Sequence, residues 1–221
     1  MRWGGRESGQ AFPAYVAVIA GLLFLAFVYL AVGQAAALRN GAQTAADAAA
    51  LGAAQDVRDQ LRDGWVEVID DPTRWQVFVL GEEYVTGRAC QKAAAFASAN
   101  GAVLLPGDCV PLDLRFTVTV KTDEAVGDSL VPGTADRHAT ATASAVVEPL
   151  CTFDPPEPSP DPTPTIEPDP SSTPSEEPEE EEPDPVLLLT CEDRDWEIDP
   201  DAPVLPGADE LFRVRLTGDD E

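Results

Sequence analysis

Residues 11–33 form an uninterrupted apolar run, AFPAYVAVIAGLLFLAFVYLAVG, that contains no charged side chain. The hydrocarbon core of a bilayer is about 30 Å thick, and an α-helix needs about 20 apolar residues to cross it. The run is long enough to do so with some tilt. We therefore predict a transmembrane helix over residues 11–33, preceded by a short tail at residues 1–10.

The charges that flank the run indicate an orientation. Arg2 and Arg6 precede it against a single Glu7, whereas the other flank offers only Arg39 before it turns acidic. This bias predicts a cytoplasmic N-terminus and an extracytoplasmic body. A cleaved secretory signal is the alternative, because residues 35–37 are small enough for a cleavage site. The hydrophobic region of such a signal spans about 7 to 15 residues, so the length of this run favours a retained anchor.

Composition limits what the rest of the chain can do. The 221 residues leave room for one modest domain beyond the membrane segment. The chain carries 14 Lys and Arg against 40 Asp and Glu, a formal net charge of −26. Such a charge repels phosphate groups, so we expect no nucleic-acid partner.

Residues 34–63 are rich in alanine and contain no proline, which predicts that the membrane helix continues outward. At 100° per residue, small apolar side chains gather on one arc of this helix and polar ones on the other. The apolar arc is a candidate helix-packing face, and it consists of Leu38, Ala42, Ala45, Ala46, Ala49 and Ala53. Two interpretations remain open: the face packs on the protein's own downstream strands, or it packs against another subunit or a partner's helix.

Shorter elements follow in residues 64–153, which we predict to form a small domain. Residues 65–70 and 74–80 are rich in Trp, Val, Ile and Phe and predict two strands joined by a turn. Residues 86–100 are alanine-rich and end at a glycine, as a short helix does.

Two stretches then alternate between apolar or small and polar residues, the pattern of half-buried strands. The first covers residues 112–121, with Leu112, Leu114, Phe116, Val118 and Val120 on one face. The second covers residues 137–147, and residues 127–133 supply the loop between them. Together these elements predict an α+β fold with a small antiparallel sheet.

Four cysteines suit two disulfides better than a metal site, because no C-x-x-C pair and no histidine cluster accompanies them. Cys90 lies on the predicted helix and Cys109 just before the first alternating strand, so a local disulfide is the favoured pairing. Cys151 and Cys191 would form the second. Four cysteines allow three pairings, and the sequence does not choose among them.

The C-terminal third divides at residue 186. Residues 154–185 contain 12 prolines, 12 acidic residues and one isoleucine, which predicts a disordered spacer. Residues 186–221 contain apolar runs at 186–189 and 211–216, and we expect this segment to return to the body and add a strand. Acidic residues alternate at positions 193, 195, 197, 199 and 201. We expect a solvated edge there, with a calcium site as the alternative, since the spacing of an EF-hand is missing.

No sequence motif points to catalysis. The chain has no G-x-S-x-G, no phosphate-binding loop, no dinucleotide fingerprint and no H-E-x-x-H motif. Its one histidine, His138, alternates with small residues on a predicted strand, which is typical of a surface side chain. We expect no enzyme activity, no cofactor, no bound metal and no small-molecule substrate.

The segment RESGQAFPAYVAVIAGLLFLAFVYLAVGQAAALRNGAQTAADAAALGAAQ resembles the N-terminus of actinobacterial pilus-assembly proteins of the TadE/TadG-like group. The later stretches LCTFDPP, TCEDRDWEIDP and LFRVRLTG are similar to the tails of TadG-related members. The resemblance implies a membrane-anchored, pilin-like protein without enzymatic activity, associated with the Flp/Tad pilus and secretion machinery as a minor pilin or assembly factor. It implies other pilus or secretion subunits as partners.

Two features depart from that group. Prepilin processing after Gly9 would place Ala14 where a glutamate is usual. The chain is also too short for the von Willebrand A domain of larger TadG proteins, and its D-x-S-x-T sequence at Asp169 falls inside the proline-rich spacer. Two hypotheses remain: a pilus or secretion assembly component, and a solitary envelope protein whose acidic domain binds cations or cell-wall components.

Overall fold

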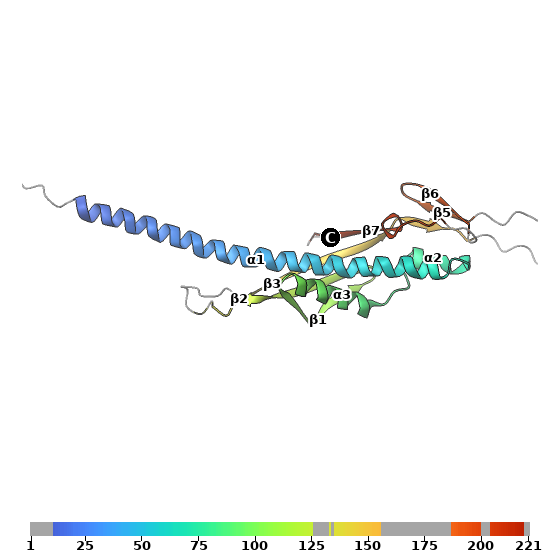
Figure 1. Cartoon of the computed structure of the whole chain (residues 1–221), viewed down its shortest axis with the longest axis horizontal. Coiled ribbons are helices and arrows are strands. Elements are labelled where there is room, and N and C mark those ends of the chain that lie inside the picture. Colours follow the sequence, from blue (N-terminus) through green and yellow to red (C-terminus); the bar gives the residue numbers. More distant parts are fainter. Residues whose placement is uncertain (1–10, 126–132, 134, 156–186, 200–203, 219–221) are drawn as a thin grey trace, which may run out of the picture. The chain divides into compact units, whose positions relative to one another are not determined.

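A long N-terminal helix followed by antiparallel strands and short helices makes this an α+β protein, as the sequence predicts (Figure 1). The computed structural model describes residues 11–125, 133, 135–155, 187–199 and 204–218. The predicted tail at residues 1–10, the loop at 127–133 except Gly133, and nearly all of the predicted spacer at 154–185 lie outside the described residues.

The described chain divides into two compact units, each assembled from separate stretches of sequence. Unit 1 contains Met1–Ala54, Gly87–Val146 and Leu216–Glu221, and unit 2 contains Gln55–Thr86 and Val147–Arg215. Each unit is described by itself below.

Helix α1 spans Ala11–Glu67 without a break, so the predicted membrane helix and the predicted alanine-rich helix are one element (Figure 1). Alanine has the highest helix propensity, which explains how the helix passes the interior residues Gly33, Gly41 and Gly52. The part of α1 up to Ala54 belongs to unit 1 and its last turns, from Gln55, belong to unit 2.

The two strands predicted at residues 65–70 and 74–80 are wrong, because helix and turn occupy both stretches. Helix α1 continues to Glu67, a 3-10 turn covers Pro72–Arg74, and α2 spans Trp75–Val79. Trp65 follows two buried α1 side chains at four-residue intervals, Val57 and Leu61, and is itself buried. The helical spacing of this apolar face therefore outweighs the strand propensity of the individual residues.

A short helix accompanies a four-stranded sheet with the strand order β1-β2-β3-β7, and most of this sheet belongs to unit 1, whereas residues 147–149 of β3 and 212–215 of β7 belong to unit 2. Helix α3 spans Thr86–Ala99, as predicted, and buries Ala89, Ala93 and Ala97. The strands are β1 (Ala102–Leu112), β2 (Arg115–Ala125), β3 (His138–Pro149) and β7 (Phe212–Thr217). The returning strand β7 confirms that the C-terminal segment adds to the sheet.

One face of this sheet supplies the core of unit 1. Phe116, Val118 and Val120 of β2 are buried, and β3 pairs with β2 so that Ala145 lies opposite Phe116 and Ala143 opposite Val118. The two alternating stretches thus form neighbouring strands, as predicted. Leu112 is an exception: it ends β1, pairs with Arg115 across a two-residue turn, and is exposed instead of buried.

Strand β1 has no counterpart among the sequence predictions. Its pairing with β2 shifts between Leu104 and Cys109, where Gly107 has a φ of 92°. This bulge and two prolines interrupt the alternation by which a strand is recognised, and an edge strand tolerates both.

Unit 2 contains a second sheet, with the strand order β4-β5-β6. The strands are β4 (Cys151–Phe153), β5 (Leu187–Cys191) and β6 (Asp195–Ile198), and a short helix α4 spans Ala208–Leu211. Its core is aromatic: the Trp65 and Trp75 rings meet edge to face with centroids 5.4 Å apart, and Phe153 lies 4.8 Å from Trp75.

Candidate membrane and assembly surfaces

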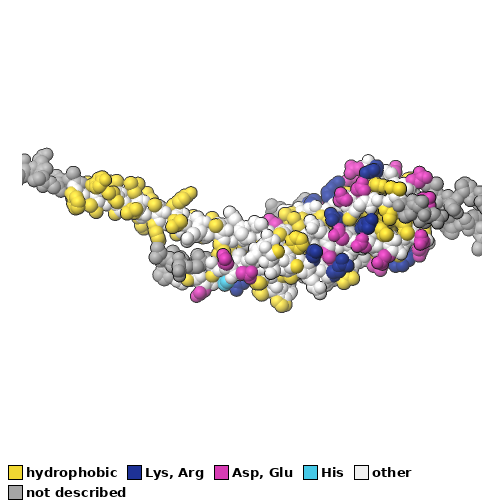
Figure 2. All heavy atoms as spheres, viewed as in Figure 1, with side chains coloured by type: hydrophobic (Ala, Val, Ile, Leu, Met, Phe, Trp, Pro, Cys, Tyr) yellow, Lys and Arg dark blue, Asp and Glu magenta, His cyan; other side chains and the backbone are white. Residues whose placement is uncertain are grey.

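The N-terminal half of α1 has an apolar surface that the chain itself does not cover. Its large side chains are exposed on every side, with Leu22, Phe24 and Tyr29 at 62%, 66% and 83%. Figure 2 shows this stretch covered by hydrophobic side chains, with no Lys, Arg, Asp or Glu between them. A helix that is apolar all round is stable either inside a protein core or inside a bilayer. Because the chain supplies no core around it, this helix is one that could span a membrane.

The predicted helix-packing face lies farther along α1, and most of it is buried within unit 1. Five of its alanines have no exposed surface, whereas Leu38 is half-buried. The buried members are Ala42, Ala45, Ala46, Ala49 and Ala53. At these positions the small side chains thus allow other elements of the same chain to approach α1 closely.

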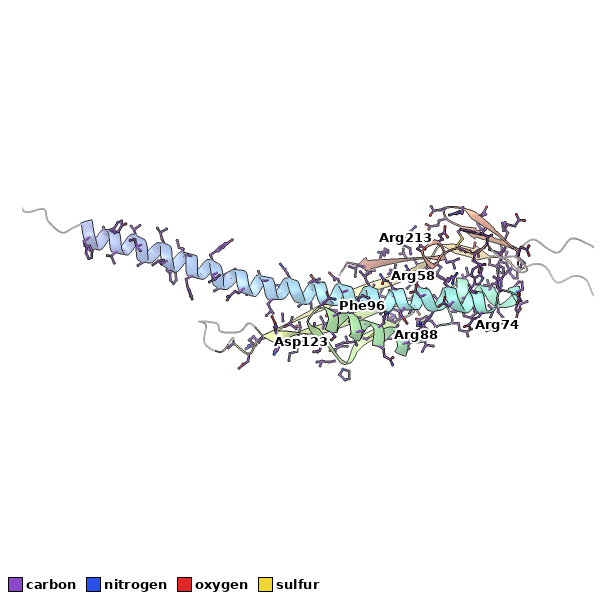
Figure 3. All side chains as sticks on the ribbon, in the orientation of Figure 1. Arg58, Arg74, Arg88, Phe96, Asp123 and Arg213 are labelled. Carbon is purple, nitrogen blue, oxygen red and sulfur yellow. A yellow bond between two sulfur atoms is a disulfide. The ribbon has the colours of Figure 1, made fainter. Side chains whose placement is uncertain are left out.

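Helix α3 is one of the elements that approach this part of α1. A Cβ atom added at Gly52 would lie 2.6 Å from Cδ2 of Phe96, which reaches from α3 towards α1 (Figure 3). The sheet approaches α1 as well, since Leu38 and Thr122 line one open cavity of about 720 Å³, and Gln43 and Thr142 line a second of about 260 Å³.

All four cysteines form the favoured pairs. Cys90–Cys109 ties α3 to β1 in unit 1, and Cys151–Cys191 joins β4 to β5 in unit 2, where the two residues are direct partners in the sheet. The second bond connects the residues that flank the long proline-rich and acidic stretch of sequence.

His138 occupies a structural position at the start of β3. Its Nδ1 donates a hydrogen bond to the backbone carbonyl of Thr122, 2.7 Å away, and the side chain is exposed. The Oγ1 of Thr122 in turn accepts a hydrogen bond from the backbone N–H of Ala139. These contacts fasten the end of β3 to β2.

The alternating acidic residues lie along and beside β6. Among the residues that the structure describes, no three His, Cys, Asp or Glu side chains gather as a metal ion would require. Asp201 lies outside the described residues. Nearby, Arg213 donates a hydrogen bond to Glu192 at 2.8 Å, and this bond raises the pKa of the guanidinium above its usual value.

Trp65 carries a feature that its sequence position does not reveal. Its indole N–H is buried and has no hydrogen-bond acceptor within the described part of the chain. The neighbouring Trp75 differs, because its Nε1 donates to the carbonyls of Val68 and Ile69 at 3.1 and 3.2 Å. Trp75 thereby holds the residues that follow α1.

Comparison with known proteins gives one match. Residues 9–56 match the family model described as putative Flp pilus-assembly TadE/G-like, a span that covers less than a quarter of the chain. This span contains the exposed apolar part of α1 and all five alanines of the buried face. No curated protein and no solved structure matches the chain.

Proposed function

We propose that the chain is a membrane-anchored, non-enzymatic component of a Flp/Tad-type pilus or secretion assembly, TadG-related and of actinobacterial origin, acting as a minor pilin-like subunit or an assembly factor. One observation carries this proposal: the family match coincides with the part of α1 whose apolar side chains the chain leaves exposed. An assembly protein of this kind works through surfaces that contact other subunits. We therefore assign those contacts to the exposed stretch of α1.

The proposed topology places the N-terminus in the cytoplasm and both units outside the membrane. The two disulfides support it, since disulfides persist in oxidising compartments and are rare in the cytosol. A protease added to intact cells should therefore remove a tag at the C-terminus. A protected tag that becomes accessible only after lysis would contradict this orientation.

The exposed part of α1 makes the assembly role testable. A photo-crosslinking amino acid replaces Leu22, which is 62% exposed, and a matched variant carries it at Ser98 on the surface of α3. We expect ultraviolet light to join the Leu22 variant to pilin-like or secretion subunits that mass spectrometry identifies, and the Ser98 variant to give far less of these products. Products that contain only lipid, or only proteins unrelated to pili and secretion, would support the solitary envelope protein instead.

A further inference from the structure

The larger of the two cavities beside α1 begins directly after the apolar run. All the residues that line it belong to unit 1, and its volume of about 720 Å³ is in the range of small-molecule sites. One wall is a single side of α1, made by Gln34, Ala37, Leu38 and Gly41, which recur at intervals of three and four residues. The other wall consists of the turn after α3 and the end of β2.

The depth of this cavity in a bilayer follows from the position of the apolar run. The hydrocarbon core is about 30 Å thick and the whole bilayer about 40 to 45 Å, so each headgroup layer is about 5 to 8 Å deep. At about 1.5 Å per residue, a helix that leaves the membrane crosses this layer in about three to five residues. The apolar run ends at Gly33, so the layer extends from Gln34 to about Leu38. The α1 wall of the cavity therefore lies among lipid headgroups, a placement that rests on the proposed membrane anchoring.

The opposite wall carries two carboxylates without a counter-charge. Asp123 and Glu124 are exposed at the end of β2, and neither side chain has an ion pair or a hydrogen bond with a residue that the structure describes. The backbone fixes their position, because the N–H of Asp123 donates to the carbonyl of Gly101 at 2.9 Å and Oγ1 of Thr122 donates to the carbonyl of Glu124 at 2.7 Å. None of the described residues that line the cavity is Lys, Arg or His.

Side-chain amides add neutral hydrogen-bond acceptors to the carboxylates. Asn100 lines the cavity, and its Nδ2 donates to the carbonyl of Phe96 at 2.8 Å, which leaves Oδ1 as an acceptor. Gln34 contributes a second amide from α1. A primary ammonium group carries a positive charge and three N–H donors, so it can bind carboxylate and amide oxygens together. A trimethylammonium group carries the same charge and no donor.

The depth and the chemistry of the cavity together select one kind of ligand. We infer that the cavity binds the headgroup of a phospholipid that carries a primary ammonium, of the ethanolamine type. The ammonium group lies at Asp123 and Glu124, and the apolar side chains of Ala37 and Leu38 contact the part of the lipid nearer the acyl chains. An anionic headgroup without an amine is repelled by the two carboxylates. The bound lipid thereby joins the end of β2 to the membrane surface.

The test uses the full chain in vesicles that contain equal amounts of an ethanolamine and a choline phospholipid with the same acyl chains. A photo-crosslinking amino acid replaces either Ala37, which lines the cavity, or Ala36, which is also exposed but lies on the other side of α1 at nearly the same depth. Mass spectrometry identifies the crosslinked lipids. We expect about threefold more ethanolamine than choline lipid at Ala37, since exposed charge pairs are individually weak, and equal amounts at Ala36.

Substitutions then assign the preference to the carboxylates. Asp123→Asn combined with Glu124→Gln keeps the size of both side chains and removes their charge, so the preference at Ala37 should disappear. Glu82→Gln combined with Asp154→Asn is the matched control, because it removes the same charge from two exposed residues that do not line the cavity. This control should keep the threefold preference.

Several results would overturn the inference. They are equal amounts of the two lipids at Ala37, a preference that persists without the two carboxylates, and crosslinks from Ala37 to the chain itself in place of lipid. A preference that a chelator abolishes would also overturn it, because the carboxylates would then bind a divalent cation.

The membrane anchoring has its own readout in the same experiment. Lipid products at Ala36 show that α1 crosses the headgroup layer at this depth whatever the headgroup, so a lost preference at Ala37 would leave the anchoring intact. The absence of lipid products at both positions would contradict the anchoring and the inference together. Capture of pilus subunits from position 22 tests the assembly role separately.

Discussion

Gly52 and Gly41 lie in the same helix and the same unit, yet alanine should have opposite effects at the two positions. An alanine in a helix interior is favoured over glycine by up to about 1 kcal/mol. At Gly41 an added Cβ meets no atom within 4 Å, so that gain should be realised in full. At Gly52 the new methyl group would lie 2.6, 2.9 and 3.2 Å from Cδ2, Cγ and Cε2 of Phe96.

The contact with Phe96 sets the magnitude. Carbon atoms in ordinary contact are about 3.5 to 4.0 Å apart, so the ring must move or the two helices must separate. Overpacking of this kind costs about 1 to 3 kcal/mol, which offsets the helix gain and leaves Gly52→Ala destabilised by up to about 2 kcal/mol. For a chain of this size, 1 kcal/mol corresponds to about 2 to 4 °C in Tm.

Thermal unfolding of the full chain in detergent micelles, followed by far-ultraviolet circular dichroism, measures both variants. We expect Gly41→Ala to raise Tm by about 2 to 4 °C and Gly52→Ala to lower it by up to about 8 °C. In a Phe96→Ala background the added methyl group has room, so Gly52→Ala should become stabilising there. The reasoning about the α1–α3 contact would be refuted if both glycine variants raised Tm equally, or if removing the Phe96 ring made no difference.

Three further predictions concern the core, the disulfides and the membrane segment. Phe116→Ala removes a ring with no exposed surface and should cost about 3 to 5 kcal/mol of unfolding free energy, measured by urea titration; a loss below about 1 kcal/mol would contradict its place in the core. Replacing Cys151 and Cys191 by serine opens a loop of 40 residues and should lower the free energy of unfolding by about 4 kcal/mol. The same replacement at Cys90 and Cys109 opens a 19-residue loop and should lower it by about 3 kcal/mol, so the first variant should have the lower Tm. Leu25→Arg places a charge in the exposed apolar part of α1 and should raise the free energy of inserting this helix into a membrane by about 2.5 to 3.5 kcal/mol. The fraction of the protein that resists carbonate extraction from membranes should therefore fall, whereas Ser98→Arg should leave it unchanged.

Sequence reasoning succeeded where a periodic signal extends over many residues. The apolar run, the alanine-rich continuation and the alternation from Phe116 to Val120 each repeat one simple rule, and each corresponds to an observed element. The order of these elements favoured one of the three possible cysteine pairings, and the structure contains those pairs.

Sequence reasoning failed where local composition and tertiary context disagree. Trp65 and Trp75 have high strand propensity, but each packs from a helix into a shared aromatic core that no local pattern encodes. Strand β1 was missed because its bulge breaks the alternation between Leu104 and Cys109.

The candidate surfaces divide in the same way. The membrane segment is visible in the sequence because bilayer thickness fixes the length that a spanning helix needs. The make-up of the sheet faces is not visible, since it depends on which residues of separate strands lie opposite one another, as Lys121 does to Thr140 and Leu188 does to Glu197. The registers that align these strands are tertiary information.

The disulfide between Cys151 and Cys191 affects how many residues can be inserted or deleted between these two cysteines without disturbing the fold. It joins two residues that are already partners in the sheet of unit 2, so the ends of the intervening sequence are fixed covalently at their native separation. Doubling the length of an open loop adds only about 0.6 kcal/mol to the entropic cost of bringing its ends together. The disulfide already holds these ends together in the unfolded chain, so the free energy of folding depends even less on the length of the loop. Insertions, deletions or an epitope tag within residues 156–186 should therefore leave the pairing of β4 with β5 intact. The length of this stretch is therefore free to vary while the folded units remain unchanged.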